Sequence, residues 1–204
     1  MASTNGLMQA SRPRGTAGFT LLELMAVLTI LMILSVAAIA SYRKYAHRGK
    51  NMEAIHMLAE IGMKQALHFS LYGEYVDTTW SSNAPAQFTN SDWYPADVAG
   101  GQKDWSISCP ADASTYPGWC ALGVRPSNGK VNYQYVTTGW APNDPVAALV
   151  IPSQGPNGEA PLLFDTTRQW WVAVARGDLD NNGLYKTFVF TSEVSEVFTL
   201  GLTE

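Results

Sequence analysis

The sequence predicts an α+β chain in which one long N-terminal helix, membrane-spanning in its first half, precedes a C-terminal antiparallel sheet. Three observations predict this fold class. An almost unbroken apolar run extends from residue 19 to 40, an amphipathic period follows it, and β-branched and aromatic segments fill the last third of the chain. About 20 apolar residues span a bilayer as a helix. We therefore predict one membrane span over about residues 19–41.

A specific motif stands at the start of this run, the hexapeptide GFTLLE at residues 18–23. Glu23 is the one ionisable residue of the run, and a carboxylate there costs roughly 2.5 to 3.5 kcal/mol on insertion scales, so it requires a positive partner. The motif resembles the cleavage and methylation motif of type IV prepilins and type II secretion pseudopilins. The resemblance implies cleavage between Gly18 and Phe19 by a prepilin peptidase, methylation of the new Phe19 amine, and a role for Glu23 in pairing that amine with a neighbouring subunit. The alternative is a plain signal anchor that tolerates Glu23.

Residues 1–18 then form a prepilin leader, and its loss removes two arginines, which makes the formal net charge of −4 two units more negative. This acidic balance predicts no nucleic-acid binding. The leader's arginines favour a cytoplasmic amino terminus, whereas a second basic group beyond the apolar run opposes it. That group is Arg43, Lys44, Arg48 and Lys50. The resemblance implies the orientation with the leader inside and the globular domain outside the cytoplasm.

The helical period continues beyond the membrane span, so we predict one helix over residues 19–71 with an amphipathic second half at 42–71. The apolar side of that half is formed by Met52, Ile55, Leu58, Ala59, Gly62, Ala66 and Phe69. The resemblance implies a pilin-like fold, in which this helix packs on the sheet of a globular domain at 72–204. Major pilins usually have a proline near the end of the apolar run. This chain has Ala40 and Ser41 there, which leaves a helix break at that point open.

A region rich in Ser, Asn, Pro, Gly and aromatic residues follows the helix, and we predict a long connecting loop over residues 72–130. Its two cysteines, Cys109 and Cys120, are the only ones in the chain. In an exported chain they are expected to form one disulfide, with free thiols as the alternative. The three histidines lie in the helical segment without metal-ligand spacing.

Strand signals begin near residue 131 and predict an antiparallel sheet over residues 131–204. Trp170 and Trp171 should point to opposite faces of it, one into the core between helix and sheet and the other toward a subunit contact or a surface pocket. The predicted strands are Val131–Thr138, Val146–Ile151, Gln169–Ala175, Tyr185–Thr191 and Val194–Leu200.

The segment from Asp178 to Gly183 has the spacing that opens a calcium loop, with Asp178, Asp180 and Asn182 as candidate ligands. Val189 stands where an EF-hand has its bidentate glutamate, so a further ligand such as Glu193 would be required. The same residues suit a hairpin turn between two strands. We predict the turn, with any calcium binding weak, and no other cofactor.

The sequence contains no phosphate loop and no zinc-helix motif, so we do not expect an enzyme. The resemblance implies a structural subunit of a type IV pilus-like filament. The alternatives are a pseudopilin of a type II secretion system and a membrane-anchored surface-binding module. The implied partners are the prepilin peptidase and methyltransferase, inner-membrane lipid before assembly, and other pilin subunits through the N-terminal helix. The implied location is the bacterial inner membrane and then a surface pilus or a periplasmic pseudopilus.

Overall fold

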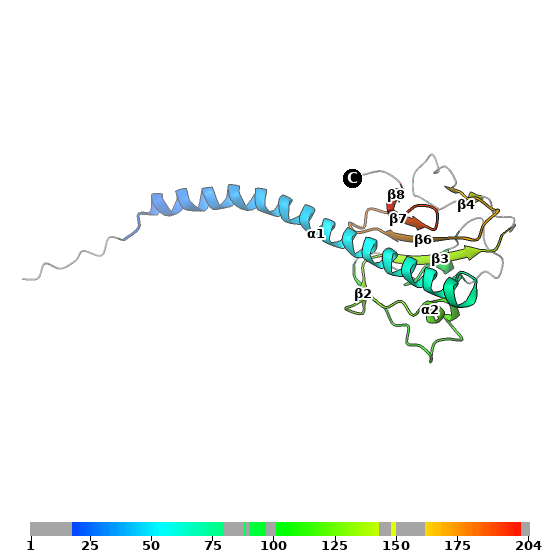
Figure 1. Ribbon diagram of the computed structural model, residues 1–204. Coiled ribbons are helices and arrows are strands. Elements are labelled where there is room, and N and C mark those ends of the chain that lie inside the picture. The colour runs from blue at the N-terminus through cyan, green and yellow to red at the C-terminus, as the bar shows by residue number, and fades with distance from the viewer. Residues whose placement is uncertain are drawn as a thin grey trace, which may run out of the picture. The chain divides into compact units, whose positions relative to one another are not determined.

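The computed structural model describes residues 18–79, 88, 90–96, 101–142, 148–149 and 162–200 of the 204-residue chain. The chain divides into two compact units, Met1–Tyr45 and Ala46–Glu204. The helix α1, Leu21–Tyr72, contributes to both units (Figure 1). It is assigned as helix without interruption through Ala40 and Ser41, so the break that the sequence left open is not formed. Its end lies one residue beyond the predicted Leu71.

The second unit contains a four-stranded antiparallel sheet in the order β3-β6-β7-β8. The strands are β3 (Gln134–Trp140), β6 (Trp170–Gly177), β7 (Lys186–Thr191) and β8 (Phe198–Leu200). Two smaller antiparallel pairs join β1 (Lys103–Asp104) to β2 (Lys130–Val131), and β4 (Ala148–Leu149) to β5 (Leu162–Leu163). The predicted antiparallel sheet is therefore confirmed. The predicted strand Val131–Thr138 is divided between β2 and β3, and of Val146–Ile151 only residues 148–149 lie within the described part of the chain.

The last strand is shorter than predicted, because it begins at Phe198 and not at Val194. The Thr191 hydroxyl accepts hydrogen bonds from the backbone N–H groups of Glu193 (3.3 Å) and Val194 (3.2 Å). A threonine side chain that takes up the following amides holds the chain in a turn, which competes with strand pairing. This local bond explains the late start of β8.

The predicted loop 72–130 contains short elements that the sequence analysis did not predict. These are a 3₁₀ turn η1 (Asn90–Asp92), β1, and a helix α2 (Pro117–Leu122). Pro117 stands in the first turn of α2, and Gly123 ends it with a left-handed φ of 62°. Proline at the start and glycine after the end are the standard helix signals, so the sequence did contain the evidence for α2.

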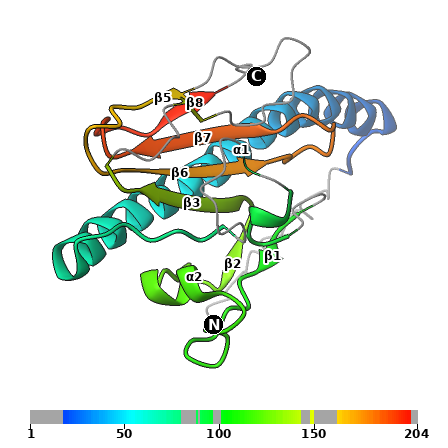
Figure 2. The ribbon, with the colours of Figure 1, turned by 90° about the vertical axis from the view of Figure 1, so that its right-hand side faces the viewer.

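One hydrophobic core lies between α1 and one face of the sheet, and Figure 2 shows the second-unit part of α1 lying across that face. Four buried residues of α1 form its helical side: Ala54, Met57, Leu58 and Ile61. The sheet side is formed by alternating strand residues, together with Tyr133, which directly precedes β3. The strand residues are Tyr135, Trp171, Ala173, Ala175 and Phe188. Alternation along β6 therefore sends its odd-numbered residues toward the helix, as expected for a pleated strand.

A second core covers the opposite face of the sheet, where the even-numbered residues of β6 lie. Trp170 is 2% exposed, and its ring is stacked on the rings of Phe164 and Trp140. The ring centroids lie 3.6 Å and 3.9 Å from that of Trp170, respectively. The two tryptophans do point to opposite faces, as predicted. The expectation that one of them serves a subunit contact or a surface pocket is wrong, because both faces of the sheet are buried. Every residue of β6 is buried for the same reason.

A buried amide fastens α1 to the chain that follows it and to the sheet. The Gln65 side chain is fully buried, and its Nε2 donates to the carbonyl oxygen of Val76 (2.8 Å) and to Oγ1 of Thr137 (2.9 Å). Its Oε1 accepts from the N–H of Val76 at 2.8 Å. The Thr137 hydroxyl in turn donates to the carbonyl oxygen of Val172 at 2.9 Å. Helix, connecting segment, β3 and β6 are thus joined through one satisfied polar network.

Gly62 lets the helix approach the sheet closely. A methyl group added there would collide with the ring of Phe190 and would lie 2.9 Å from Cη2 of Trp171. Gly49, on the same helix, has nothing within 4 Å of the equivalent position. The first glycine is therefore required by packing, and the second is not.

We predict that the same substitution at these two glycines changes stability in opposite directions. Gly62→Ala should lower the free energy of unfolding by about 1 to 3 kcal/mol through overpacking. Gly49→Ala should raise it by up to about 1 kcal/mol, because alanine is the better helix former. Denaturant unfolding of the full chain in detergent micelles, followed by tryptophan fluorescence, measures both. A destabilisation at Gly49 as large as that at Gly62 would contradict the packing argument.

Candidate functional site

The N-terminal end of α1 begins inside the GFTLLE motif. Thr20 precedes the helix, and its Oγ1 accepts a hydrogen bond from the backbone N–H of Glu23 at 3.2 Å. Its carbonyl oxygen accepts from the N–H of Leu24, also at 3.2 Å. Thr20 is therefore the N-cap, and Glu23 occupies the third helical position, which is the sequence spacing of a capping box. The sequence analysis missed this role, although the T-x-x-E spacing signals it.

The apolar part of α1 can cross a membrane by length and composition, with the candidate span at Leu21–Ile39. None of that window is buried within the protein itself. Its hydroxyl groups are satisfied within the helix, because Thr29 donates to the carbonyl oxygen of Met25 (2.8 Å) and Ser35 to that of Leu31 (2.7 Å). Such bonds remove the cost of placing a hydroxyl in hydrocarbon. This part of the helix is thus suited to an apolar environment.

Phe19 and Glu23 are both exposed at this end, Phe19 with 84% of its surface free. A carboxylate in the first turn of a helix is stabilised by the helix dipole. Within the described residues, no cationic side chain lies within ion-pair distance of the Glu23 carboxylate. Gly18, Phe19 and Glu23 therefore lie together at the start of an uncovered apolar helix, as the sequence predicted. The pairing of Glu23 with an amine stays a prediction.

These features define a class of protein, one with a single apolar N-terminal helix, a cap at its start and a separate α+β unit beyond it. Residues 13–39 match the family described as the prokaryotic N-terminal methylation motif. This motif is the signature of type IV pilins and pseudopilins. The match contains the cleavage and assembly residues inferred above and ends at the end of the candidate span. Comparison with curated proteins finds no match to this chain.

The two cysteines are joined as predicted. Cys109 and Cys120 form a disulfide with a Cα–Cα distance of 5.5 Å, and it ties the chain before α2 to the helix itself. Both cysteines pack against the core between α1 and the sheet. Closing a loop of this size stabilises a fold by about 3 kcal/mol in the chain-entropy model. The bond therefore holds a segment that has few strand contacts of its own.

The tryptophans of the predicted loop do not form a surface for ligands. Trp93, Trp105 and Trp119 are 2%, 8% and 3% exposed, and the rings of the last two meet edge to face with centroids 5.1 Å apart. All described tryptophans are similarly buried. Their size and their burial show that they fill the two cores. An aromatic binding platform, as the surface-binding alternative requires, is absent from the described part of the chain.

A buried arginine closes one end of the second core. Arg176 is 8% exposed, and its guanidinium carbon lies 4.0 Å from the ring centroid of Trp93 and 5.1 Å from that of Tyr185. Its Nε donates to Oε1 of Gln134 at 2.9 Å. Burial lowers the pKa of Arg176 from its usual value. Aromatic faces and an amide thus provide the environment of this charge, which is the arrangement of a structural arginine.

The segment from Asp178 to Gly183 links β6 and β7, whose register is antiparallel, so the predicted hairpin is formed. The Asp178 carboxylate accepts hydrogen bonds from the backbone N–H groups of Asn182 (3.0 Å) and Gly183 (2.8 Å). Asn181 and Gly183 have positive φ values of 58° and 83°, as such turns require. Asp180 accepts from the side-chain amide of Asn182 at 2.8 Å. The three candidate calcium ligands are therefore engaged in turn hydrogen bonds.

The additional ligand considered for calcium lies elsewhere. Glu193 is at the other end of the hairpin, since Thr191 pairs with Val172 whereas Lys186 pairs with Gly177. About 17 Å of strand separates these two ends. Val189, at the twelfth position of the loop pattern, is fully buried in the second core. Glu193 therefore does not lie where it could complete a site at Asp178.

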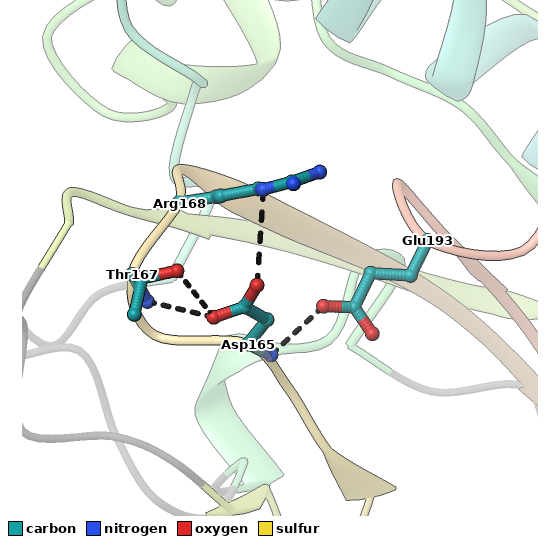
Figure 3. A network of polar contacts seen from close by, with 4 residues as sticks. All are labelled: Asp165, Thr167, Arg168 and Glu193. Carbon is teal, nitrogen blue, oxygen red and sulfur yellow. Dashed lines mark hydrogen bonds and ion pairs between the residues drawn. The ribbon is translucent and has the colours of Figure 1, made fainter.

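Glu193 instead joins two loops at its own end of the sheet, as Figure 3 shows. Its Oε1 accepts from the backbone N–H of Asp165 at 2.9 Å. The Asp165 carboxylate accepts from the hydroxyl (2.6 Å) and the N–H (3.0 Å) of Thr167, and lies 3.8 Å from Nε of Arg168. The hydrogen bonds from Thr167 hold the pKa of Asp165 below its usual value. This network closes the turn before β6.

We predict that Asp178 acts through its turn hydrogen bonds and binds calcium weakly or not at all. Asp178→Ala should lower the free energy of unfolding by about 1 to 3 kcal/mol, because it removes the acceptor for two backbone N–H groups. Asp180→Ala is the matched control and should change it by less than about 0.5 kcal/mol, because this side chain is exposed.

Calorimetric titration of the full chain in detergent tests the calcium part. Micromolar or tighter binding that disappears in both variants would show that the loop is a metal site.

Proposed function

We propose that this chain is a structural subunit of a type IV pilus-like filament, made as a prepilin, cleaved after Gly18 and assembled through α1. One observation carries the proposal: the N-methylation signature at residues 13–39 opens an apolar helix that its own chain leaves uncovered. A bilayer can cover that surface before assembly, and the helices of neighbouring subunits can cover it afterwards. The subunit would be anchored in the inner membrane with its globular unit outside the cytoplasm.

The role assigned to Glu23 follows from the cost of its charge. A carboxylate at this depth is unfavourable in lipid unless a cation lies beside it. Cleavage after Gly18 would create an amine on Phe19 at nearly the same depth, and methylation leaves such an amine able to carry a proton. Pairing the Glu23 of one subunit with the Phe19 amine of another would make association of the helices favourable and would set their register.

We infer a structural and not an enzymatic role, because the signature at residues 13–39 belongs to structural subunits. The described residues contain no group of three or more His, Cys, Asp or Glu side chains that could hold a metal ion. The buried polar side chains of Gln65, Arg176 and Asp178 make hydrogen bonds that support the fold. We therefore propose a scaffold function for the α+β unit, which folds around two cores and presents the helix.

The location at which the protein accumulates distinguishes a pilin from a pseudopilin. Surface filaments sheared from cells, imaged and analysed by mass spectrometry, should contain this chain if it is a pilin. Detection of the protein in the cell envelope alone, with sheared filaments that lack it, would favour the pseudopilin.

We predict that the mature chain begins at Phe19 with an N-methylated amine. Mass spectrometry of the intact protein from cells with an active prepilin peptidase measures this directly. Deletion of the peptidase should return the mass of the chain with residues 1–18 attached. A protein that keeps this leader in the presence of the active peptidase would remove the basis of the proposal.

We also predict that Glu23→Gln abolishes or strongly reduces filament assembly while the protein still inserts in the membrane. The substitution removes a charge that is costly in lipid, so insertion should not decline, and the helix cap is kept because it uses the backbone N–H of Glu23. Glu60→Gln, which removes the same charge from α1 outside the span, is the matched control. Normal filament numbers with Glu23→Gln would contradict the assigned role.

A further inference from the structure

The stretch of α1 that follows the candidate membrane span has an unusual concentration of positive charge. Its four basic residues, Arg43, Lys44, Arg48 and Lys50, are called here the basic collar. No acidic residue occurs between Glu23 and Glu53. From residue 51 onward the chain carries sixteen acidic and seven basic residues. The mature chain thus has a net positive segment of less than three helical turns next to the candidate span, followed by a net negative remainder.

The sequence places the four collar positions on one side of an ideal helix. At 100° per residue, these positions fall within an arc of about 160°, and Tyr42, Tyr45 and Gly49 fall on the remaining arc. Tyr42 is 72% exposed and Tyr45 is 75% exposed. Exposed tyrosines beside an apolar span are typical of the membrane–water interface, where their rings lie among the headgroups. The segment therefore combines an aromatic side with a cationic side.

The collar also lies at headgroup depth. The candidate span ends at Ile39, so Arg43 is about 6 Å and Lys50 about 16 Å farther along the helix axis. The headgroup layer of one leaflet is about 5 to 8 Å thick. Arg43 and Lys44 fall within that layer, and the long side chains at positions 48 and 50 can reach back to it. Arg48 is exposed in the structure.

The placement of this charge is costly for the proposed topology. Basic residues favour the cytoplasmic side of a membrane, and the collar lies on the opposite side when the globular unit is exported. Anionic headgroups beside the collar would offset this unfavourable placement by neutralising its charge.

We propose that the basic collar binds the headgroups of anionic phospholipids, such as phosphatidylglycerol, and anchors the subunit before assembly. This inference rests on the proposed function for the side of the membrane on which the collar lies. The acidic surface of a second copy is the competing partner. The lipid is favoured because it is present at the collar's depth in every membrane-inserted subunit, beside the two interfacial tyrosines.

The test compares lipid preferences of the full chain in vesicles. All proteins carry Arg12→Gln and Arg14→Gln, which remove the cations of the leader. The fraction of spin-labelled phosphatidylglycerol restricted by the protein is compared with that of spin-labelled phosphatidylcholine. We expect a preference of about fivefold for phosphatidylglycerol, the ratio expected when one basic side chain meets one anionic headgroup. It should fall toward one as salt rises to about 1 M, where the Debye length is about 3 Å.

Two matched variants test whether the preference for phosphatidylglycerol depends on the collar. Replacing the four collar residues by Gln should bring the preference close to one, whereas a control with the same loss of charge in the globular unit should keep it. The control replaces Lys64, Arg125, Lys130 and Arg168 by Gln. Gln preserves helix propensity, so the collar variant should insert and fold normally. The salt titration of the protein with an intact collar tests the proposal without any change to the collar.

Three results would overturn the proposal: no preference with the collar intact, the same loss in the control, or a preference that the collar variant retains. If the collar variant retains the preference, energy transfer between labelled copies in phosphatidylcholine vesicles is measured next. A loss of this energy transfer in the collar variant would show that the collar contacts a second copy of the chain. The vesicle measurement requires neither cleavage nor filaments. Its failure would therefore leave the filament proposal standing, and the absence of filaments would leave the lipid preference standing.

Discussion

The hydrogen bonds of Gln65 hold the second unit together at the point where helix, connecting chain and sheet meet. The amide binds both backbone groups of Val76 and the hydroxyl of Thr137, which itself binds Val172 in the central strand. The chain leaving α1 is thereby fixed beside β3, and Thr78 pairs with the backbone of Thr137 on the same edge. An unsatisfied amide in this position would cost more than its bonds contribute, so the network admits one arrangement of the three segments.

That arrangement explains why the sheet can be apolar on both sides. The helix covers one face through four aliphatic residues and the close approach at Gly62. The opposite face is covered by a second set of aromatic and aliphatic side chains, among them Trp93 and Phe164. A strand that is buried on both faces usually has a nearly continuous run of apolar residues, and β6 has such a run. The described tryptophans therefore fill the cores of the second unit, whereas the apolar side chains of Leu21–Ile39 are exposed.

The charged residues are distributed unevenly along the chain, as the apolar residues are. The span contains one carboxylate, the collar that follows contains four basic residues, and the remainder is strongly acidic. Under the proposed function each group would meet a different neighbour. Glu23 would meet a cation within hydrocarbon, the collar an anion at the headgroup level, and the acidic unit water, where charges are screened over about 8 to 10 Å. The same helix thus connects three environments.

Properties that depend on local sequence were predictable, because a few neighbouring residues are enough to produce them. These include the long apolar helix, the GFTLLE motif, the hairpin at Asp178 and the approximate strands β3, β6 and β7. The disulfide also followed from the sequence, since the chain has only two cysteines. α2 was predictable but missed, although Pro117 and Gly123 marked it. Only the tertiary structure decided which groups meet across long separations. It buried Trp170, placed Glu193 at the far end of the hairpin, and brought Gln65 to Thr137, 72 residues away. Alternation along a strand specifies two faces, but what covers each face depends on segments that no local pattern connects.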